Sequence, residues 1–150
     1  MYQEVEYEMR VAAGPDRVFP LLCPVREHDW VEGWRAEVLR SASGVAEAGC
    51  VFATGVGYDQ VTWVVHRFLP PRQIGFTLVQ PDAFIELLEI EVTEQDQGSA
   101  LRWRRAVTPL TAAGQRIVEQ RIAGHAERHR WLERALDHHL ATGGRLARQG

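Results

Sequence analysis

Apolar and charged residues alternate at the start of the chain. Val5, Tyr7, Met9 and Val11 are separated by charged residues, and a period of two residues predicts a strand with one buried face and one solvated face. The turn sequence 14–16, Gly-Pro-Asp, is expected to end this strand.

Two short helical segments are predicted after this turn. Pro15 suits the first turn of a helix, and apolar residues recur at helical spacing from Val18 to Leu22 until Pro24 stops the run. A second short helix is predicted over residues 25–31. The first strand is therefore expected to lead into two short helices.

The middle of the chain, residues 34–109, has the pattern of strands separated by turns. Turn residues occur at Ser43-Gly44, Gly55 to Gly57, Pro70-Pro71, Pro81-Asp82 and Gln97-Gly98. These breaks give about six strands, which with the first make seven. A run of hairpins predicts a curved antiparallel sheet that is covered on one side.

The last segment is expected to supply that cover. Residues 111–140 contain no proline and predict one long helix with an apolar stripe on one side. The stripe contains Val118, Ile122, His125, His129, Leu132, Leu136 and Leu140. We expect a single α+β domain over residues 1–143 and a frayed polar tail over residues 144–150.

Strand pairing assigns side chains to the two faces of the sheet. A hairpin centred on Pro70-Pro71 places these residues together on the inner face: Val61, Trp63, Val65, Phe76 and Leu78. A two-residue turn at Asp96-Gln97 places a second inner set side by side: Leu88, Ile90, Val92, Leu101, Trp103 and Arg105. On the outer face, Glu89 and Glu91 are then opposite Arg104 and Arg102.

The same register turns Arg105 inward, and Glu86 as well unless a bulge intervenes near residues 85–87. A buried guanidinium is costly unless it is paired, and Glu86 is the nearest candidate partner. Arg105 has two further possible roles. It either extends to solvent at the cavity mouth or holds the carboxylate or phenolate end of a ligand.

Composition narrows the classes of function. The chain has 150 residues, of which 45% are hydrophobic, and this suits one domain with one core. Its 17 basic and 20 acidic residues give a net charge of −3, which argues against a nucleic-acid partner. Every basic residue is arginine, so Schiff-base and lysine-base chemistry are excluded.

The spacing of the cysteines and the absence of long apolar runs are used to predict the cellular location. Cys23 and Cys50 have no metal-ligand spacing and are expected to be buried or free thiols rather than zinc ligands. There is no signal-like N-terminus and no apolar run of about 20 residues that would span a membrane. We therefore expect a cytoplasmic protein, monomeric or homodimeric, without a metal or other cofactor.

The order of elements and several short stretches resemble the START-like helix-grip superfamily (SRPBCC). Residues 11–19, VAAGPDRVF, resemble the entry into the first helix in these domains, and residues 24–34, PVREHDWVEGW, resemble bacterial members grouped with polyketide cyclase/dehydrase and lipid-transport proteins. Residues 49–52 and 132–140 are also similar to that group. The resemblance covers residues 3–143 and implies a seven-stranded antiparallel sheet wrapped around one long C-terminal helix.

A sheet that grips a helix leaves a cavity, which is the default site for an apolar ligand. The predicted ligand-binding residues are Trp63, Phe76, Leu78, Leu88, Ile90, Trp103, Arg105, Val118, Ile122, His125, His129 and Leu132, with Leu136 also in the lining and Trp30 and Trp34 at one end. The alternative is that these side chains fill the core completely. The superfamily includes carriers, receptors, cyclases and co-chaperones, so the fold alone does not define an activity.

His125 and His129 are one helical turn apart in the apolar stripe. They are interpreted as core histidines with satisfied hydrogen bonds, as polar anchors for a ligand, or as acid–base groups. The leading prediction is a protein that binds a hydrophobic, lipid-like or aromatic polyketide-like small molecule. The alternative is a cyclase or aromatase-like enzyme that uses both histidines, with Arg105 as the anchor for a carbonyl group.

Overall fold

The computed structural model describes residues 1–148, except for the side chain of Tyr58. Seven strands form one antiparallel sheet in the order β1-β7-β6-β5-β4-β3-β2. Their bounds are β1 Gln3–Val11, β2 Ala36–Arg40, β3 Val51–Thr54, β4 Val61–Leu69, β5 Gln73–Gln80, β6 Phe84–Gln95 and β7 Gly98–Pro109. The helical elements are α1 Pro15–Val18, η1 Phe19–Leu22, η2 Arg26–Asp29, η3 Gly57–Asp59, α2 Ala112–Ala123 and α3 His125–Thr142.

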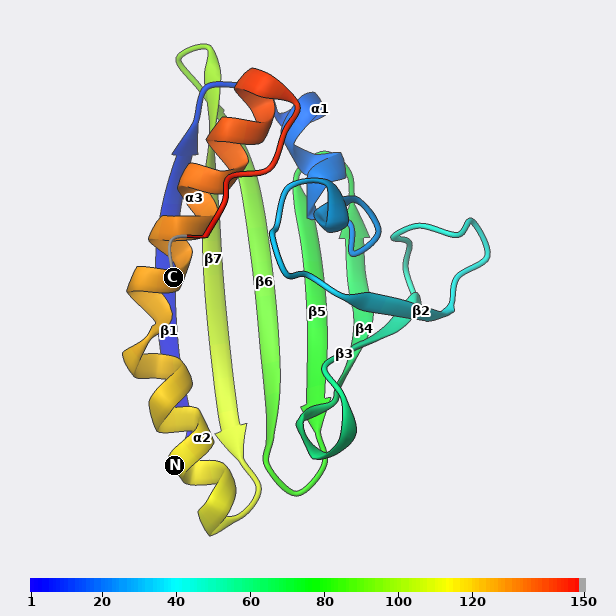
Figure 1. Ribbon diagram of the computed structural model, residues 1–150, viewed down its shortest axis with the longest axis vertical. Helices are drawn as coiled ribbons and strands as arrows, with labels where there is room; N and C mark the ends of the chain where they lie inside the picture. Colours follow the sequence, from blue (N-terminus) through cyan, green and yellow to red (C-terminus); the bar gives the residue numbers. More distant parts are fainter. Residues whose placement is uncertain (149–150) are drawn as a thin grey trace.

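The helices gather on one face of the curved sheet (Figure 1). Helices α2 and α3 run along the side formed by β1 and β7, whereas the short N-terminal helices lie toward β5 and β4. The predicted seven-stranded helix-grip architecture is therefore confirmed. The N-terminal prediction is also confirmed, because Gly14 precedes α1 and Pro15 is its first residue.

The predicted strand registers are confirmed. Trp63 is opposite Leu78, and Leu88 is opposite Arg105. Strand β6 pairs with β7 without a shift from Phe84 to Gln95, so the bulge that would have turned Glu86 outward does not form. Glu86 is 1% exposed and lies on the inner face.

The charged outer face is paired differently from the prediction. Glu89 and Arg104 are opposite each other in the ladder, but the Glu89 carboxylate contacts His66 Nε2 at 2.7 Å and Arg67 Nε at 3.4 Å. Arg102 forms its ion pair with Glu6 on β1, at 3.1 Å. Long side chains therefore reach diagonal and next-strand partners, which cross-strand position alone does not specify.

The prediction of one continuous helix over residues 111–140 is wrong at Gly124. This residue has φ −90° and ψ 0°, and it separates α2 from α3. Glycine is the least favourable residue of a helix interior after proline, so a change of direction costs least here. The backbone bonds Gly124 N to Gln120 O and Arg128 N to Gly124 O are both kept at 3.1 Å.

The two ends of the C-terminal helical segment are capped by its own residues. The Thr111 side chain accepts a hydrogen bond from Gly114 N and donates one to Asp82 O, at 3.0 and 2.5 Å. These bonds fix the start of α2 against the turn between β5 and β6. At the other end, Gly143 has φ 78°, the left-handed conformation that commonly terminates helices.

After α3, residues 144–148 fold back onto the molecule. Leu146 packs against the hydrophobic core, the Arg148 guanidinium lies 4.6 Å from the Trp131 ring centroid, and the backbone N of Arg148 donates to the Glu32 carboxylate. The last two residues of the tail predicted to be frayed lie outside the described residues. Within residues 1–148, no helix is both long enough and apolar enough to cross a bilayer.

Two glycines of the C-terminal segment give a direct test of the packing. A Cβ on Gly114 would lie 1.9 Å from the Ala83 carbonyl oxygen, whereas a Cβ on Gly124 would lie 3.5 Å from Gln120 O. We expect Gly114→Ala to lower the free energy of unfolding by about 2–3 kcal/mol. Gly124→Ala should raise it by about 0.5–1 kcal/mol. Urea unfolding followed by circular dichroism measures both, and equal effects would contradict the docking of α2 on Ala83.

Candidate functional site

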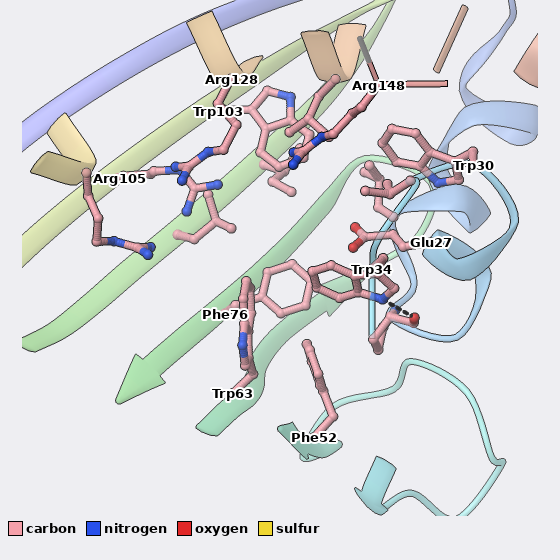
Figure 2. Close-up of a pocket in the computed structure, with 17 residues that line it drawn as sticks. Glu27, Trp30, Trp34, Phe52, Trp63, Phe76, Trp103, Arg105, Arg128 and Arg148 are labelled. Carbon is pink, nitrogen blue, oxygen red and sulfur yellow. Dashed lines mark hydrogen bonds between the residues drawn. The ribbon is translucent and has the colours of Figure 1, made fainter. Parts of the chain in front are cut away.

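A cavity of about 190 Å³ lies between the inner face of the sheet, α3 and the N-terminal helices (Figure 2). The strands contribute its aromatic and aliphatic wall, and the helical elements contribute most of its charged groups. Its lining residues are Leu22, Pro24, Glu27, Trp30, Val31, Trp34, Phe52, Trp63, Phe76, Leu88, Ile90, Trp103, Arg105, Arg121, Arg128, Leu132 and Arg148.

One wall of the cavity is a cluster of aromatic rings. Phe52 stacks on Trp63 with centroids 5.1 Å apart, and Phe76 meets Trp63 edge to face at 5.7 Å and 86°. Trp34 makes a second edge contact with Trp63, at 6.0 Å. Each ring orients its neighbour, so the cluster presents a preformed apolar surface.

Hydrogen bonds fix the indole groups of this wall. Trp34 Nε1 donates to Pro24 O at 2.8 Å, and Trp63 Nε1 donates to Thr54 Oγ1 at 2.9 Å. Trp30 Nε1 donates to Leu21 O at 2.8 Å, which ties η2 to η1. Because the polar atoms are already bonded to protein acceptors, the ring surfaces are left for apolar contacts.

The predicted lining residues divide into two groups. Those that line the cavity are Trp63, Phe76, Leu88, Ile90, Trp103, Arg105 and Leu132, together with Trp30 and Trp34. Those absent from this lining are Leu78, Val118, Ile122, His125, His129 and Leu136. Val118 and Leu136 have no exposed surface. At Val118 of α2 and Leu136 of α3 the interface between helix and sheet is therefore filled core, and the cavity occupies only part of that interface.

Sequence reasoning missed four ionisable lining residues: Glu27, Arg121, Arg128 and Arg148. A signal for Arg128 was present, because it stands three residues after His125 and four before Leu132 and so borders the apolar stripe. Glu27 gave no comparable signal, because it lies in a four-residue 3-10 helix.

A buried ion network lies at one end of the cavity. Glu86 on β6 binds Arg105 on β7 at 2.5 Å and Arg121 on α2 at 2.9 Å. Burial alone would raise the pKa of Glu86, but the two guanidinium charges outweigh it and hold this pKa below its usual value. Burial lowers the pKa of Arg105, and Glu86 opposes that effect. The predicted Arg105–Glu86 contact is thus present.

The two histidines lie behind Arg105, outside the cavity lining. Arg105 Nε donates to His129 Nε2 at 3.3 Å, and His129 is stacked on Tyr7 at 5.5 Å. Burial and the Arg105 charge lower the pKa of His129 to about 2 and that of His125 to about 4. Both rings are neutral at pH 7, and His129 serves as an acceptor that orients Arg105. The predicted alternative of histidines with satisfied hydrogen bonds is met only at His129 Nε2, because His125 Nε2 and His129 Nδ1 are buried without a partner in the described structure.

Glu27 is the carboxyl group that faces the cavity from η2 (Figure 2). Its surroundings are the indole rings of Trp30 and Trp34, and burial raises its pKa to about 8, partly opposed by the charge of Arg105. At neutral pH this carboxyl group is largely protonated. It can therefore donate a hydrogen bond or exchange a proton near pH 8.

We searched the described part of the chain for side chains that could bind a metal ion together. Across residues 1–148, no three His, Cys, Asp or Glu side chains come together in an arrangement that could hold an ion. Cys23 and Cys50 are buried free thiols. The ionisable side chains that line the cavity are Glu27 and the four arginines.

A curved antiparallel sheet that holds a C-terminal helix over an aromatic-lined cavity defines a helix-grip ligand-binding fold. The sequence match identifies the group within that class. The chain belongs to the polyketide cyclase / dehydrase and lipid transport family, whose model matches residues 2–141. This match confirms the resemblance noted from the sequence. No curated protein matches the chain.

Solved structures share the fold. Mll3558 from Rhizobium loti has a TM-score of 0.68 at 19% identity, covering 91% of this chain and 96% of its own. CalU16 from Micromonospora echinospora has a TM-score of 0.64 at 20% identity, covering 90% and 76%. An uncharacterized protein from Rhizobium leguminosarum reaches 0.71 at 14% identity, covering 92% and 96%. Identities this low establish the fold alone.

The histidine pair predicts acid sensitivity. Both pKa values are below 6.5 in the folded protein, so protons bind the unfolded chain preferentially below pH 6.5 and stability falls as pH decreases. Each histidine adds a slope of up to about 1.4 kcal/mol per pH unit between pH 6.5 and its pKa in the folded protein. We expect urea unfolding between pH 6.5 and 4.5 to show a shallower slope for the double variant His125→Gln/His129→Gln. The contribution of Glu27 is the same in both proteins and cancels from the comparison. Equal slopes for the two proteins would therefore contradict the neutral buried state of the histidines.

Proposed function

We propose that the protein binds a compact hydrophobic small molecule, preferably aromatic, in the cavity beneath α3. The observation that carries this proposal is an aromatic-walled cavity of about 190 Å³. Family membership is consistent with it, because the family is described by polyketide cyclisation or dehydration and lipid transport.

The cavity volume favours a ligand of one or two rings. An engineered apolar cavity of about 150 Å³ holds benzene, whereas sites for drug-sized ligands usually measure about 300–1,000 Å³. At about 190 Å³, this cavity accommodates a substituted single ring or a small bicycle. A long acyl chain or a fused tetracycle would require the helices to move away from the sheet.

The neutral bicyclic ketone 1-indanone is a suitable probe of this proposal. We expect it to quench tryptophan fluorescence with a Kd between about 10 μM and 1 mM. Leu132→Trp should fill the cavity from α3 and weaken binding at least about tenfold, because Leu132 is a lining residue. Leu69→Trp, at a position 48% exposed, is the matched control and should bind normally. Tight binding of palmitate with no binding of 1-indanone would contradict a compact ligand.

An enzymatic alternative is favoured by the position of Glu27. Cyclase-like chemistry needs an acid–base group at the substrate, and Glu27 lines the cavity whereas His125 and His129 do not. Its pKa of about 8 suits transfer of a proton near neutral pH. In this alternative, the Glu27 carboxylate would remove an α-proton from a carbonyl compound, and the Arg105 guanidinium would stabilise the enolate oxygen.

Hydrogen–deuterium exchange at the α-carbon of 1-indanone in D₂O tests this alternative by NMR. The Glu27 carboxylate removes the α-proton, and the C–H electron pair forms the enolate. The proton on Glu27 then exchanges with D₂O, and Glu27 delivers a deuteron to the α-carbon. The protein-dependent rate should rise with pH toward a plateau above about pH 8, because the pKa of Glu27 is raised to about 8. Glu27→Gln should abolish it, and Glu37→Gln on exposed β2 should not. Equal rates in all three proteins would exclude Glu27 as the base.

A further inference from the structure

The cavity lining carries more positive than negative charge. Four lining residues are arginines, Arg105, Arg121, Arg128 and Arg148, and one is a carboxylic acid, Glu27. Glu86, which lies behind the lining, binds Arg105 and Arg121. The cavity and its immediate surroundings thus contain four guanidinium groups and only two carboxyl groups. This excess of basic groups adjoins the apolar aromatic wall.

Three of the four arginines are held by protein groups. Arg105 contacts Glu86 and His129. Arg121 contacts the other oxygen of Glu86 and lies 4.7 Å from the Phe84 ring centroid. Arg148 rests on the Trp131 ring at 4.6 Å. These contacts fix three guanidinium groups at the cavity boundary.

Arg128 differs from these three residues. In the described residues 1–148, its guanidinium has neither a hydrogen bond nor an ion pair. Figure 2 shows it reaching from α3 into the cavity, on the side of Trp103 and Arg105. Burial and the charges of Arg105 and Arg121 lower its pKa to about 10. A partly buried cation beside like charges is unfavourable unless an anion joins it.

The chemistry of a guanidinium indicates the kind of partner that Arg128 would take. It offers N–H donors and a positive charge at the cavity. A ligand that supplies oxygen acceptors would complement it, whereas a pure hydrocarbon would leave these donors unbonded.

We propose that the ligand is a compact aromatic carboxylate, whose carboxylate group binds the Arg128 guanidinium while its ring packs against Trp63 and Phe76. This inference rests on the proposed ligand-binding function and specifies its chemical class. A planar guanidinium can hold both carboxylate oxygens through parallel N–H donors, which gives affinity and orientation together. An inorganic anion would satisfy Arg128 but leave the aromatic wall unused.

A matched pair of probes separates charge from shape. 4-Ethylbenzoate and 4-ethylbenzamide have the same ring and nearly the same size, but only the first is an anion at pH 7. We expect calorimetry to give a Kd for the acid that is at least about tenfold lower than for the amide, because charge-assisted hydrogen bonds are stronger than neutral ones. Inorganic phosphate should compete only weakly.

The variant Arg128→Gln tests the assignment of the binding group. It should weaken binding of 4-ethylbenzoate at least about tenfold and change binding of the amide less than about threefold. Arg130→Gln, on the exposed side of the same helix, is the matched control and should leave both affinities unchanged. Arg128→Gln also removes an unpaired charge, so its unfolding midpoint should equal or exceed that of the unmodified protein.

The outcomes separate this inference from the proposed function. If 1-indanone binds but the acid and the amide bind equally, or if Arg128→Gln weakens both probes alike, the cavity binds aromatic molecules and the anion assignment is wrong. Phosphate that binds as tightly as 4-ethylbenzoate would show that the aromatic body contributes nothing. If neither 1-indanone nor either benzoic derivative binds, the proposed function fails as well.

Discussion

The Glu86 carboxylate is the constraint on which the rest of this structure depends. It is 1% exposed, and a carboxylate at that depth is tolerated only when strong donors surround it. Arg105 on β7 and Arg121 on α2 supply them, and Arg105 continues to His129 on α3. One buried charge thereby links the central strands to both halves of the C-terminal helical segment.

This network also determines the character of the cavity. Glu86 is occupied by Arg105 and Arg121, and Arg128 has no carboxylate contact among the described residues, so the cavity keeps a positive surplus. On the opposite wall, the interlocked rings of Phe52, Trp63 and Phe76 supply apolar surface. A cavity with one cationic wall and one aromatic wall favours a ligand that carries both features.

Local sequence patterns predicted most of the architecture, because the determining interactions are short-range or repeat along a strand. The Asp96-Gln97 turn predicted the β6–β7 register, and that register placed Arg105 on the inner face, whereas the orientation of Glu86 stayed open until the ladder proved to have no bulge. The outcome at Gly124 was not predicted, because the helical pattern of apolar residues continues across the glycine. Helical periodicity reports which side of a helix is buried, and it does not report a change in the axis.

The cavity itself was predicted less completely than the fold. The stripe that contains Val118, Ile122, His125 and His129 was expected to line the cavity, yet none of these four side chains borders it, and His129 instead accepts a hydrogen bond from Arg105. Whether a buried side chain fills space or borders it depends on the distance between helix and sheet, which sequence periodicity does not encode. Glu27 enters from a short 3-10 helix whose position depends on the bonds of Trp30 and Trp34 to backbone carbonyls.

The most direct test of this account is the location of a bound aromatic acid. Nuclear Overhauser contacts between 4-ethylbenzoate and the isotope-labelled protein would measure it. The account predicts contacts from the ring protons to Trp63 and Phe76, together with a shifted Arg128 side-chain N–H signal. Contacts confined to the outer face of the sheet, or an Arg128 signal that does not respond to the ligand, would contradict it.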